Sequence, residues 1–164
     1  MNELRTESAR DAEYRNTLEN WLFLRHTPGV GDFTFHTLLN AFGTVEAIFN
    51  ASHKQLSALA IKPAVIAALL NEEKPDISAD LQWNRQSNHH IIPFSDKAYP
   101  AQLKQLADAP PVLYVRGDPD YLIQPQLAMV GTRNPTAAGL NTAREFASHL
   151  SNAGITIISG LASG

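Results

Sequence analysis

The residues with the clearest chemical potential form a short polar loop, Gly131-Thr132-Arg133, between an apolar run and a helical pattern. Arginine supplies a permanent cation and a planar fork of N–H donors that suits phosphate groups. A helix that starts just after the loop offers backbone N–H groups that also favour an anion. The loop therefore predicts a phosphate-binding site with Arg133 as its cation. The alternative interpretation is a surface arginine paired with an acidic neighbour.

The same loop differs from a dinucleotide-binding fingerprint, which reads G-x-G-x-x-G. This chain has the first glycine, but Arg133 and Thr136 occupy the positions of the second and third. A glycine at the second position lets the backbone approach a pyrophosphate closely, and an arginine side chain prevents that approach. The loop thus suits a phosphodiester better than a dinucleotide, and we expect no cofactor.

Two apolar runs must position this loop. Residues 127–130 and 155–158 are short and apolar, as is typical of strands buried on both faces of a parallel sheet. Apolar residues between them recur at helical spacing, namely Leu140, Ala143, Ala147 and Leu150. Either Thr136 or Asn134 can cap this helix, and Gly154 allows a left-handed end. The pattern predicts a right-handed strand–helix–strand unit whose loops leave the carboxyl ends of parallel strands, where α/β sheets bind ligands.

A second loop follows the second strand and reads Ser159-Gly160-Leu161-Ala162-Ser163-Gly164. The paired motifs, G-T-R after one strand and S-G-L-A-S-G after the next, resemble those of the DNA-processing protein A family, also called Smf. The resemblance extends back through residues 110–117 and, more weakly, through the N-terminal helices. Family members continue the second loop with Ile-Asp, and this chain stops before it, so we expect a fragment of a longer protein.

The resemblance implies a non-enzymatic protein that binds single-stranded DNA, protects incoming DNA and loads the RecA recombinase during natural transformation. The phosphate-binding residues that it implies are Gly131, Thr132, Arg133, Gly160, Leu161, Ala162, Ser163 and Gly164. It also implies a homodimer in the full-length protein, and a small helical domain of sterile-alpha-motif (SAM) type in front of a Rossmann-like domain.

The turn at residues 28–31, P-G-V-G, lies between two amphipathic segments and resembles a helix–hairpin–helix. Glycines in such hairpins leave backbone N–H groups free to bind a phosphate. Here Asp32 adjoins the turn and no Lys or Arg follows within residues 32–36, so a hairpin that only packs two helices is favoured. We therefore predict that removing residues 1–75 changes single-strand affinity by less than about tenfold.

The charged, proline-containing segment at residues 71–76 makes the best domain boundary. Residues 1–75 predict an all-α, SAM-like domain, with helices from about Thr17 to Asn71. Residues 76–164 predict the first part of a Rossmann-like parallel-sheet domain, incomplete at its C-terminal end, so the fold class is α/β. Short elements expected before the loops are helices at 78–86 and 99–106 and strands at 91–94 and 112–115.

The composition excludes several classes of protein. There is no cysteine, so a disulfide framework, a thiolate metal site and a cysteine nucleophile are excluded. No signal peptide and no membrane span are indicated, which predicts a cytoplasmic soluble protein. The net charge is −3, with 7 basic and 9 acidic residues in 1–75 and 6 basic and 7 acidic residues in 76–164. Any DNA contact must therefore come from a local patch.

Other motifs have ordinary structural explanations. His89 and His90 are adjacent on a predicted strand and point to opposite faces, which disfavours a shared metal. Asp118 and Asp120 flank a proline in a predicted turn, which favours ordinary turn chemistry over general acid–base catalysis by this pair. Two alternative functions stay open: a Rossmann-like hydrolase of nucleoside monophosphates, although its P-G-G-x-G-T loop is absent, and a helical interaction module joined to an incomplete fold. Hydrolysis of a nucleoside monophosphate would favour the first alternative, and a gel shift with an oligonucleotide would favour DNA binding.

Overall fold

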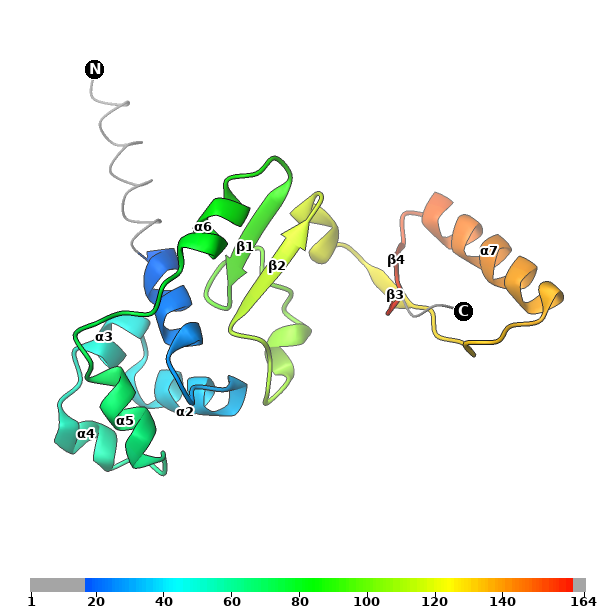
Figure 1. Cartoon of the computed structure of the whole chain (residues 1–164). Helices are drawn as coiled ribbons and strands as arrows, with labels where there is room; N and C mark the ends of the chain where they lie inside the picture. The colour runs from blue at the N-terminus through cyan, green and yellow to red at the C-terminus, as the bar shows by residue number, and fades with distance from the viewer. Residues whose placement is uncertain (1–16, 161–164) are drawn as a thin grey trace, which may run out of the picture. The chain divides into compact units, whose positions relative to one another are not determined.

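A computed structural model of the chain describes residues 17–160 (Figure 1). The chain forms two compact units, Met1–Asp118 and Pro119–Gly164, called unit 1 and unit 2 below. Within the described residues, no helix has the length and apolar character needed to cross a membrane.

The first part of unit 1 is helical throughout, as predicted. Residues 17–26 are helical. The helices that follow are α2 (Asp32–Phe42), α3 (Val45–Phe49), α4 (His53–Ser57), α5 (Pro63–Leu69) and α6 (Ser78–Asn84). Local sequence signals explain their starts: Thr44 caps α3 by accepting a hydrogen bond from Ala47 N, and Ser52 forms a capping box with Gln55 at the start of α4.

A β-hairpin completes unit 1. Strand β1 (His89–Pro93) pairs antiparallel with β2 (Val112–Arg116), so the strands predicted at 91–94 and 112–115 are confirmed. The helix predicted at 99–106 is only a 3-10 turn, Leu103–Gln105. The side chain of Asn84 at the end of α6 accepts a hydrogen bond from Ile91 N at 2.8 Å, which ties α6 to β1.

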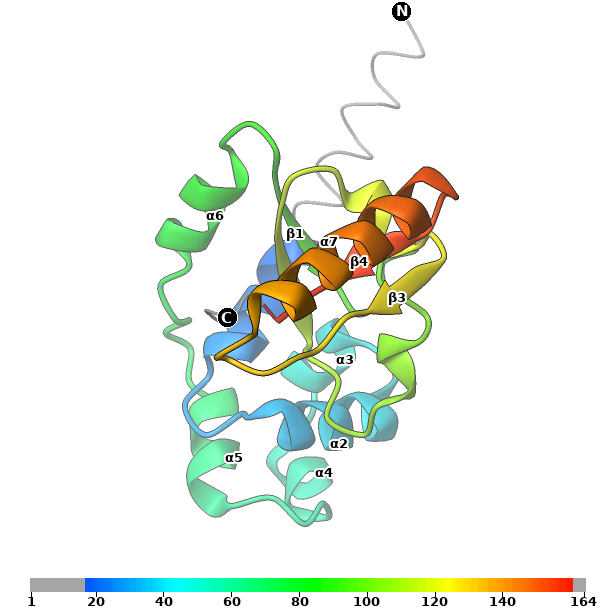
Figure 2. The same cartoon turned by 90° about the vertical axis from the view of Figure 1, so that its right-hand side faces the viewer.

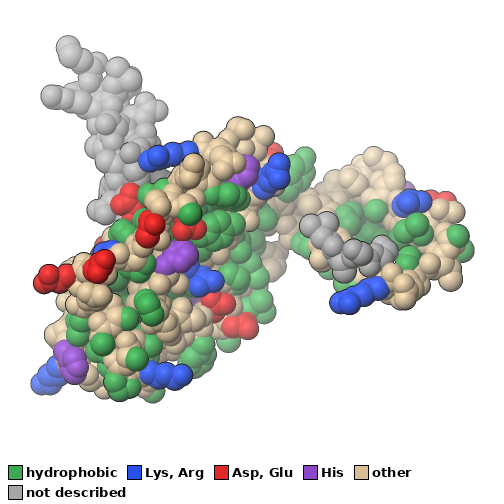
Figure 3. All heavy atoms as spheres, in the orientation of Figure 1, with side chains coloured by type: hydrophobic (Ala, Val, Ile, Leu, Met, Phe, Trp, Pro, Cys, Tyr) green, Lys and Arg blue, Asp and Glu red, His purple; other side chains and the backbone are tan. Residues whose placement is uncertain are grey.

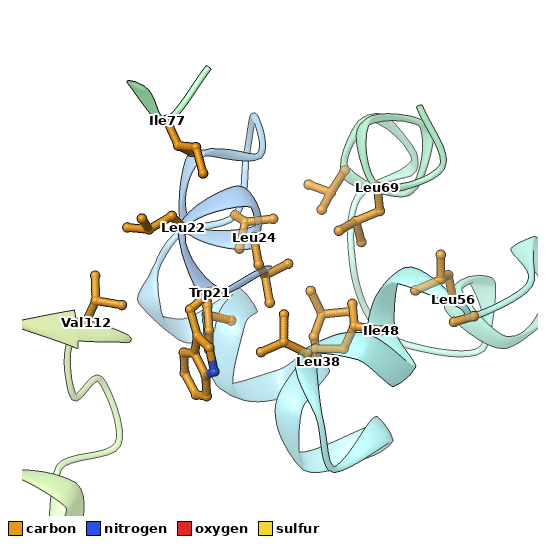
Figure 4. Close-up of a cluster of buried hydrophobic side chains, with 14 of the residues drawn as sticks. Trp21, Leu22, Leu24, Leu38, Ile48, Leu56, Leu69, Ile77 and Val112 are labelled. Atoms are coloured by element: carbon orange, nitrogen blue, oxygen red, sulfur yellow. The ribbon is translucent and has the colours of Figure 1, made fainter. Parts of the chain in front are cut away.

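One apolar core joins the helices to the hairpin (Figure 4). Leu22 and Leu38 from the helices lie in the same cluster as Ile77, Ile91 and Val112. The link at residues 71–76 is largely exposed. The core therefore crosses the boundary predicted at residue 75, and a division there into a SAM-like and a Rossmann-like domain stays a prediction.

Unit 2 is a strand–helix–strand unit. It contains a 3-10 turn (Pro119–Leu122), β3 (Gln126–Ala128), α7 (Ala137–Asn152) and β4 (Thr156–Ile158). β3 and β4 are parallel, as predicted, with Leu127 opposite Ile157, and α7 packs against β4 (Figure 2). Gly154 follows α7 with φ of 83°, the left-handed conformation expected for a helix end.

The prediction that these two strands are buried on both faces is wrong. Leu127 is 40% exposed, Ile158 is 42% exposed, and Val130, which follows β3, is 94% exposed. A sheet of two strands packed against a single helix leaves its other face and both edges uncovered, whereas burial on both faces requires helices on both sides.

Candidate nucleic-acid interface

The parallel pairing of β3 and β4 brings both predicted loops to the same edge of the sheet. The backbone N–H of Met129 donates to the carbonyl of Ile158 at 2.9 Å, which extends the pairing up to the loops. An open groove of about 610 Å³ lies at this edge. Its lining includes Arg133 from the first loop and Gly160 from the second, so the predicted juxtaposition of the loops is present in the geometry.

Hydrogen bonds within the first loop fix its path into α7. The hydroxyl oxygen of Thr132 accepts from Asn134 N at 3.2 Å and closes a tight turn. The hydroxyl of Thr136 then accepts from Gly139 N at 3.1 Å, so Thr136 and not Asn134 is the N-cap. The first N–H groups of a helix have no partner within that helix, and they carry its partial positive charge. The groove thus lies at an end of α7 that favours anions.

Arg133 is the only Lys or Arg among the described residues that line the groove. It is exposed, and it forms no ion pair with another described residue. This disfavours the alternative of a surface arginine neutralised by an acidic neighbour. No described carboxylate therefore neutralises its guanidinium group.

The structure accounts for half of the predicted site residues. Those that line the groove are Gly131, Thr132, Arg133 and Gly160. Leu161, Ala162, Ser163 and Gly164 lie outside the described residues. Phosphate binding by the whole set stays a prediction.

Sequence reasoning missed Gly139, which also lines the groove. A Cβ atom built on Gly139 would lie 3.2 Å from the Thr136 hydroxyl oxygen, closer than most real contacts. Glycine therefore keeps the cap of α7 compact. The sequence signal for Gly139 is its position three residues after a threonine that can cap the helix.

The turn at residues 28–31 shows close helix packing. Gly29 has φ of 83°, and a Cβ atom built on it would lie 2.8 Å from Cγ2 of Val65 in α5. His36 on α2 donates from Nε2 to the carbonyl of Ala109 at 2.6 Å. This hydrogen bond connects α2, the helix after the turn, to the segment before β2. These contacts support the interpretation that the turn serves to pack helices together. That the turn contributes little to DNA affinity stays a prediction.

Among the described residues, no group of three or more His, Cys, Asp or Glu side chains lies close enough together to hold a metal ion. His89 and His90 therefore belong to no such group. Nδ1 of His89 lies 2.8 Å from the carbonyl oxygen of Ser87. The ring of His89 packs edge-on against Trp83, with 4.5 Å between ring centroids. This histidine therefore has structural contacts of its own.

The parallel strand–helix–strand unit defines an α/β protein with a groove and one cationic loop at the carboxyl edge of its strands, where such sheets bind ligands. The family model described as DNA recombination-mediator protein A matches residues 90–164. This match covers β1 from its second residue, β2 and the whole of unit 2. Over these residues, which are slightly less than half of the chain, the sequence is similar to that family.

Named relatives show the same similarity. Protein Smf of Escherichia coli (strain K12) is 40% identical over 95 residues, which cover 58% of this chain and 25% of that protein. DNA processing protein DprA of Bacillus subtilis (strain 168) is 36% identical over 105 residues, 63% of this chain and 35% of that protein. DprA of Streptococcus pneumoniae (strain ATCC BAA-255 / R6) is 36% identical over 69 residues, 42% of this chain and 24% of that protein. The chain thus spans about a quarter to a third of the length of these relatives.

Proposed function

We propose that the chain is part of a protein that binds single-stranded DNA, protects incoming DNA and loads the RecA recombinase onto it during natural transformation. One observation carries the DNA-binding step: the groove that joins Arg133 to Gly160 at the carboxyl edge of β3 and β4. The family's description as a recombination mediator, and the relatives named DNA processing protein, support DNA as the ligand.

The magnitudes favour a direct contact between Arg133 and a phosphate. The dipole of α7 stabilises an anion by only about 0.3–1 kcal/mol. A chain with net charge −3 gains nothing from long-range attraction to DNA. A charge-assisted hydrogen bond from an arginine contributes roughly 1.5–3 kcal/mol. Arg133 is therefore the main contact, and Gly131 and Thr132 add backbone and hydroxyl donors.

We propose binding without catalysis at this groove. Its described lining residues include no Asp, Glu, His, Cys or Lys, which are the usual general acids and bases. A mediator role also requires that DNA leave the protein chemically unchanged. RecA and a second copy of the full-length protein are the proposed protein partners.

A binding titration tests this function. The protein is titrated into a labelled single-stranded oligonucleotide of mixed sequence, with the same strand as a duplex in parallel. We expect tighter binding to the single strand. In a second arm, nucleoside monophosphates are incubated with the protein and analysed for loss of the base or the phosphate. Turnover without single-strand binding would favour the hydrolase alternative and contradict the proposal.

A further inference from the structure

A second surface, in unit 1, combines aromatic rings with a cation. It consists of Trp83 from α6, His89 from β1, and Tyr114 and Arg116 from β2, and is called the α6–hairpin surface below. The ring of Trp83 packs edge-on against both other rings, with centroids 4.5 Å from His89 and 5.3 Å from Tyr114. His89 lies opposite Arg116 in the strand register. The four side chains therefore form one contiguous group.

The rings of this surface are open to solvent in a way that core rings are not. Tyr114 is 46% exposed, and Trp83 is only partly buried. In the core, by contrast, Trp21 stacks face to face on Phe35 with 5.2 Å between centroids, and both are buried. The exposed part of the Tyr114 side chain is therefore open to a ligand, and an exposed aromatic ring can accept a stacked base.

Hydrogen bonds hold Tyr114 in one orientation. Its hydroxyl donates to Oδ1 of Asp80, and Oδ2 of the same carboxylate lies 2.9 Å from Nε2 of His26. Burial, together with the Asp80 carboxylate, keeps the pKa of Tyr114 well above its usual value, so the hydroxyl stays a neutral donor. A ring held in place loses little conformational entropy when a ligand stacks on it.

The charges around these rings suit a polyanion. Arg116 and Arg25 are exposed, and Arg25 lies close enough for its charge to act on the Tyr114 hydroxyl. The carboxylate of Asp80 is engaged by His26 and Tyr114. Figure 3 shows separate Lys or Arg side chains and a His side chain near α6 and the adjoining ends of β1 and β2, with Asp or Glu side chains beside α6.

We infer that the α6–hairpin surface is a base-stacking contact for a single nucleic-acid strand, with Arg116 on an adjacent phosphate. Nonspecific single-strand sites combine these two elements, a ring for the base and a cation for the backbone. This contact lies in a different unit from the Arg133 groove. The inference goes beyond the proposed phosphate site because this contact depends on the bases of the strand. It does not require the Arg133 site.

Tryptophan fluorescence tests the inference directly, because the chain has two tryptophans and Trp21 is 3% exposed. The probes are an oligothymidylate strand and an abasic strand of equal length, which keeps the phosphates and lacks the bases. We expect the thymidylate strand to quench Trp83 and the abasic strand to leave it unchanged. Trp83→Phe should bind the thymidylate strand without quenching, because a phenyl ring replaces the indole.

Substitutions separate stacking from folding. Tyr114→Ala should weaken binding of the thymidylate strand by about fivefold or more. Tyr114→Phe keeps the ring but loses the hydrogen bond to Asp80, so its affinity should lie between that of Tyr114→Ala and that of the parent protein. Arg116→Ala should weaken both strands, and Lys62→Ala, which removes an exposed cation at the start of α5, should weaken neither. Circular dichroism and thermal melts verify that each variant is folded.

The two binding sites can fail separately. If Arg133→Ala has no effect while Tyr114→Ala weakens binding, the proposed groove is wrong and the α6–hairpin surface stands. Three results overturn the inference: no quenching at saturating thymidylate strand, equal quenching by the abasic strand, or parent-like affinity in a folded Tyr114→Ala variant. A surface that binds protein and not nucleic acid would give the first of these results.

Discussion

Thr136 is the residue that starts α7 and so shapes the groove. Its hydroxyl accepts from Gly139 N at 3.1 Å. Thr136→Ala should lower the free energy of unfolding by about 0.5–2 kcal/mol, and Thr136→Ser should restore most of it. Urea titrations followed by circular dichroism measure the difference. Equal stability of the alanine and serine variants would show that the cap contributes nothing.

Tyr99 makes the stability of unit 1 depend on alkaline pH. The side chain is 2% exposed, and its hydroxyl donates to the carbonyl of Pro110 at 2.7 Å. Burial, with a smaller contribution from the charge of Asp32, raises the pKa of Tyr99 from 10.0 to about 12. Since the folded chain favours the neutral phenol, this stabilisation is complete below pH 10 and is lost between pH 10 and about pH 12.

Unfolding titrations between pH 8 and pH 12 check this dependence. The free energy of unfolding should fall less steeply above pH 10 in Tyr99→Phe than in the parent chain, because phenylalanine has no proton to lose. A fall of equal steepness in both proteins would show that Tyr99 titrates normally.

Residue-level features that depend on near neighbours could be predicted from the sequence. Arg133 lies in the short loop that follows an apolar run, and Ser52 with Gln55 has the sequence spacing of a capping box. The contact of His36 with Ala109 joins residues 73 positions apart. No local pattern encodes such a contact, because it depends on how the hairpin packs against the helices.

At the scale of elements, two glycines with nearly the same positive φ distinguish the cost of backbone strain from the cost of a packing clash. Gly29 and Gly43 have φ of 83° and 81°, but only Gly29 would place a Cβ atom close to another side chain, that of Val65. Gly43→Ala should destabilise the chain by about 1 kcal/mol, through the left-handed conformation alone. Gly29→Ala should cost more, because Val65 must also move.

The same pair tests the role of the turn at residues 28–31. Thermal melts give the stability of each variant, and oligonucleotide titrations give its affinity. If the turn only packs helices, Gly29→Ala should keep its single-strand affinity within about tenfold while the fold is intact. A larger loss in a folded Gly29→Ala variant, with Gly43→Ala unaffected, would make the turn a phosphate site.

The sequence predicted the type of most elements and missed their exposure. Apolar spacing and capping residues predict the helices in unit 1, and short apolar runs predict β3 and β4. An apolar run does not state how many layers will cover it, so Leu127 and Ile158 were expected inside and lie about 40% exposed. Nor did it state that β1 and β2 pair antiparallel.

At the scale of the molecule, the core of unit 1 changes how the role of residues 1–75 is best tested. Ile91 and Val112 of the hairpin pack in one cluster with Leu22 and Leu38 of the helices. Removing residues 1–75 would remove the helical half of that cluster and expose the apolar side chains of the β-hairpin. A loss of affinity in such a truncation would then report unfolding, so point substitutions such as Gly29→Ala give the cleaner answer.

Arg133 is proposed to bind backbone phosphates of single-stranded DNA. The most direct test compares the parent protein with Arg133→Ala, using Arg144→Ala as the matched control, because Arg144 is an exposed arginine of α7 outside the groove lining. Fluorescence anisotropy gives the affinity for several single strands of different sequence over a range of salt concentrations.

Arg133→Ala should weaken binding to all strands about equally, because a phosphate contact carries no base information. The fall of log affinity with log salt should become shallower by about 0.7 for each phosphate that the variant no longer neutralises. Arg133→Lys should recover part of the affinity, since it restores the charge but not the planar fork. If Arg133→Ala is folded and changes affinity and salt dependence no more than Arg144→Ala does, the phosphate site lies elsewhere and the claim is contradicted.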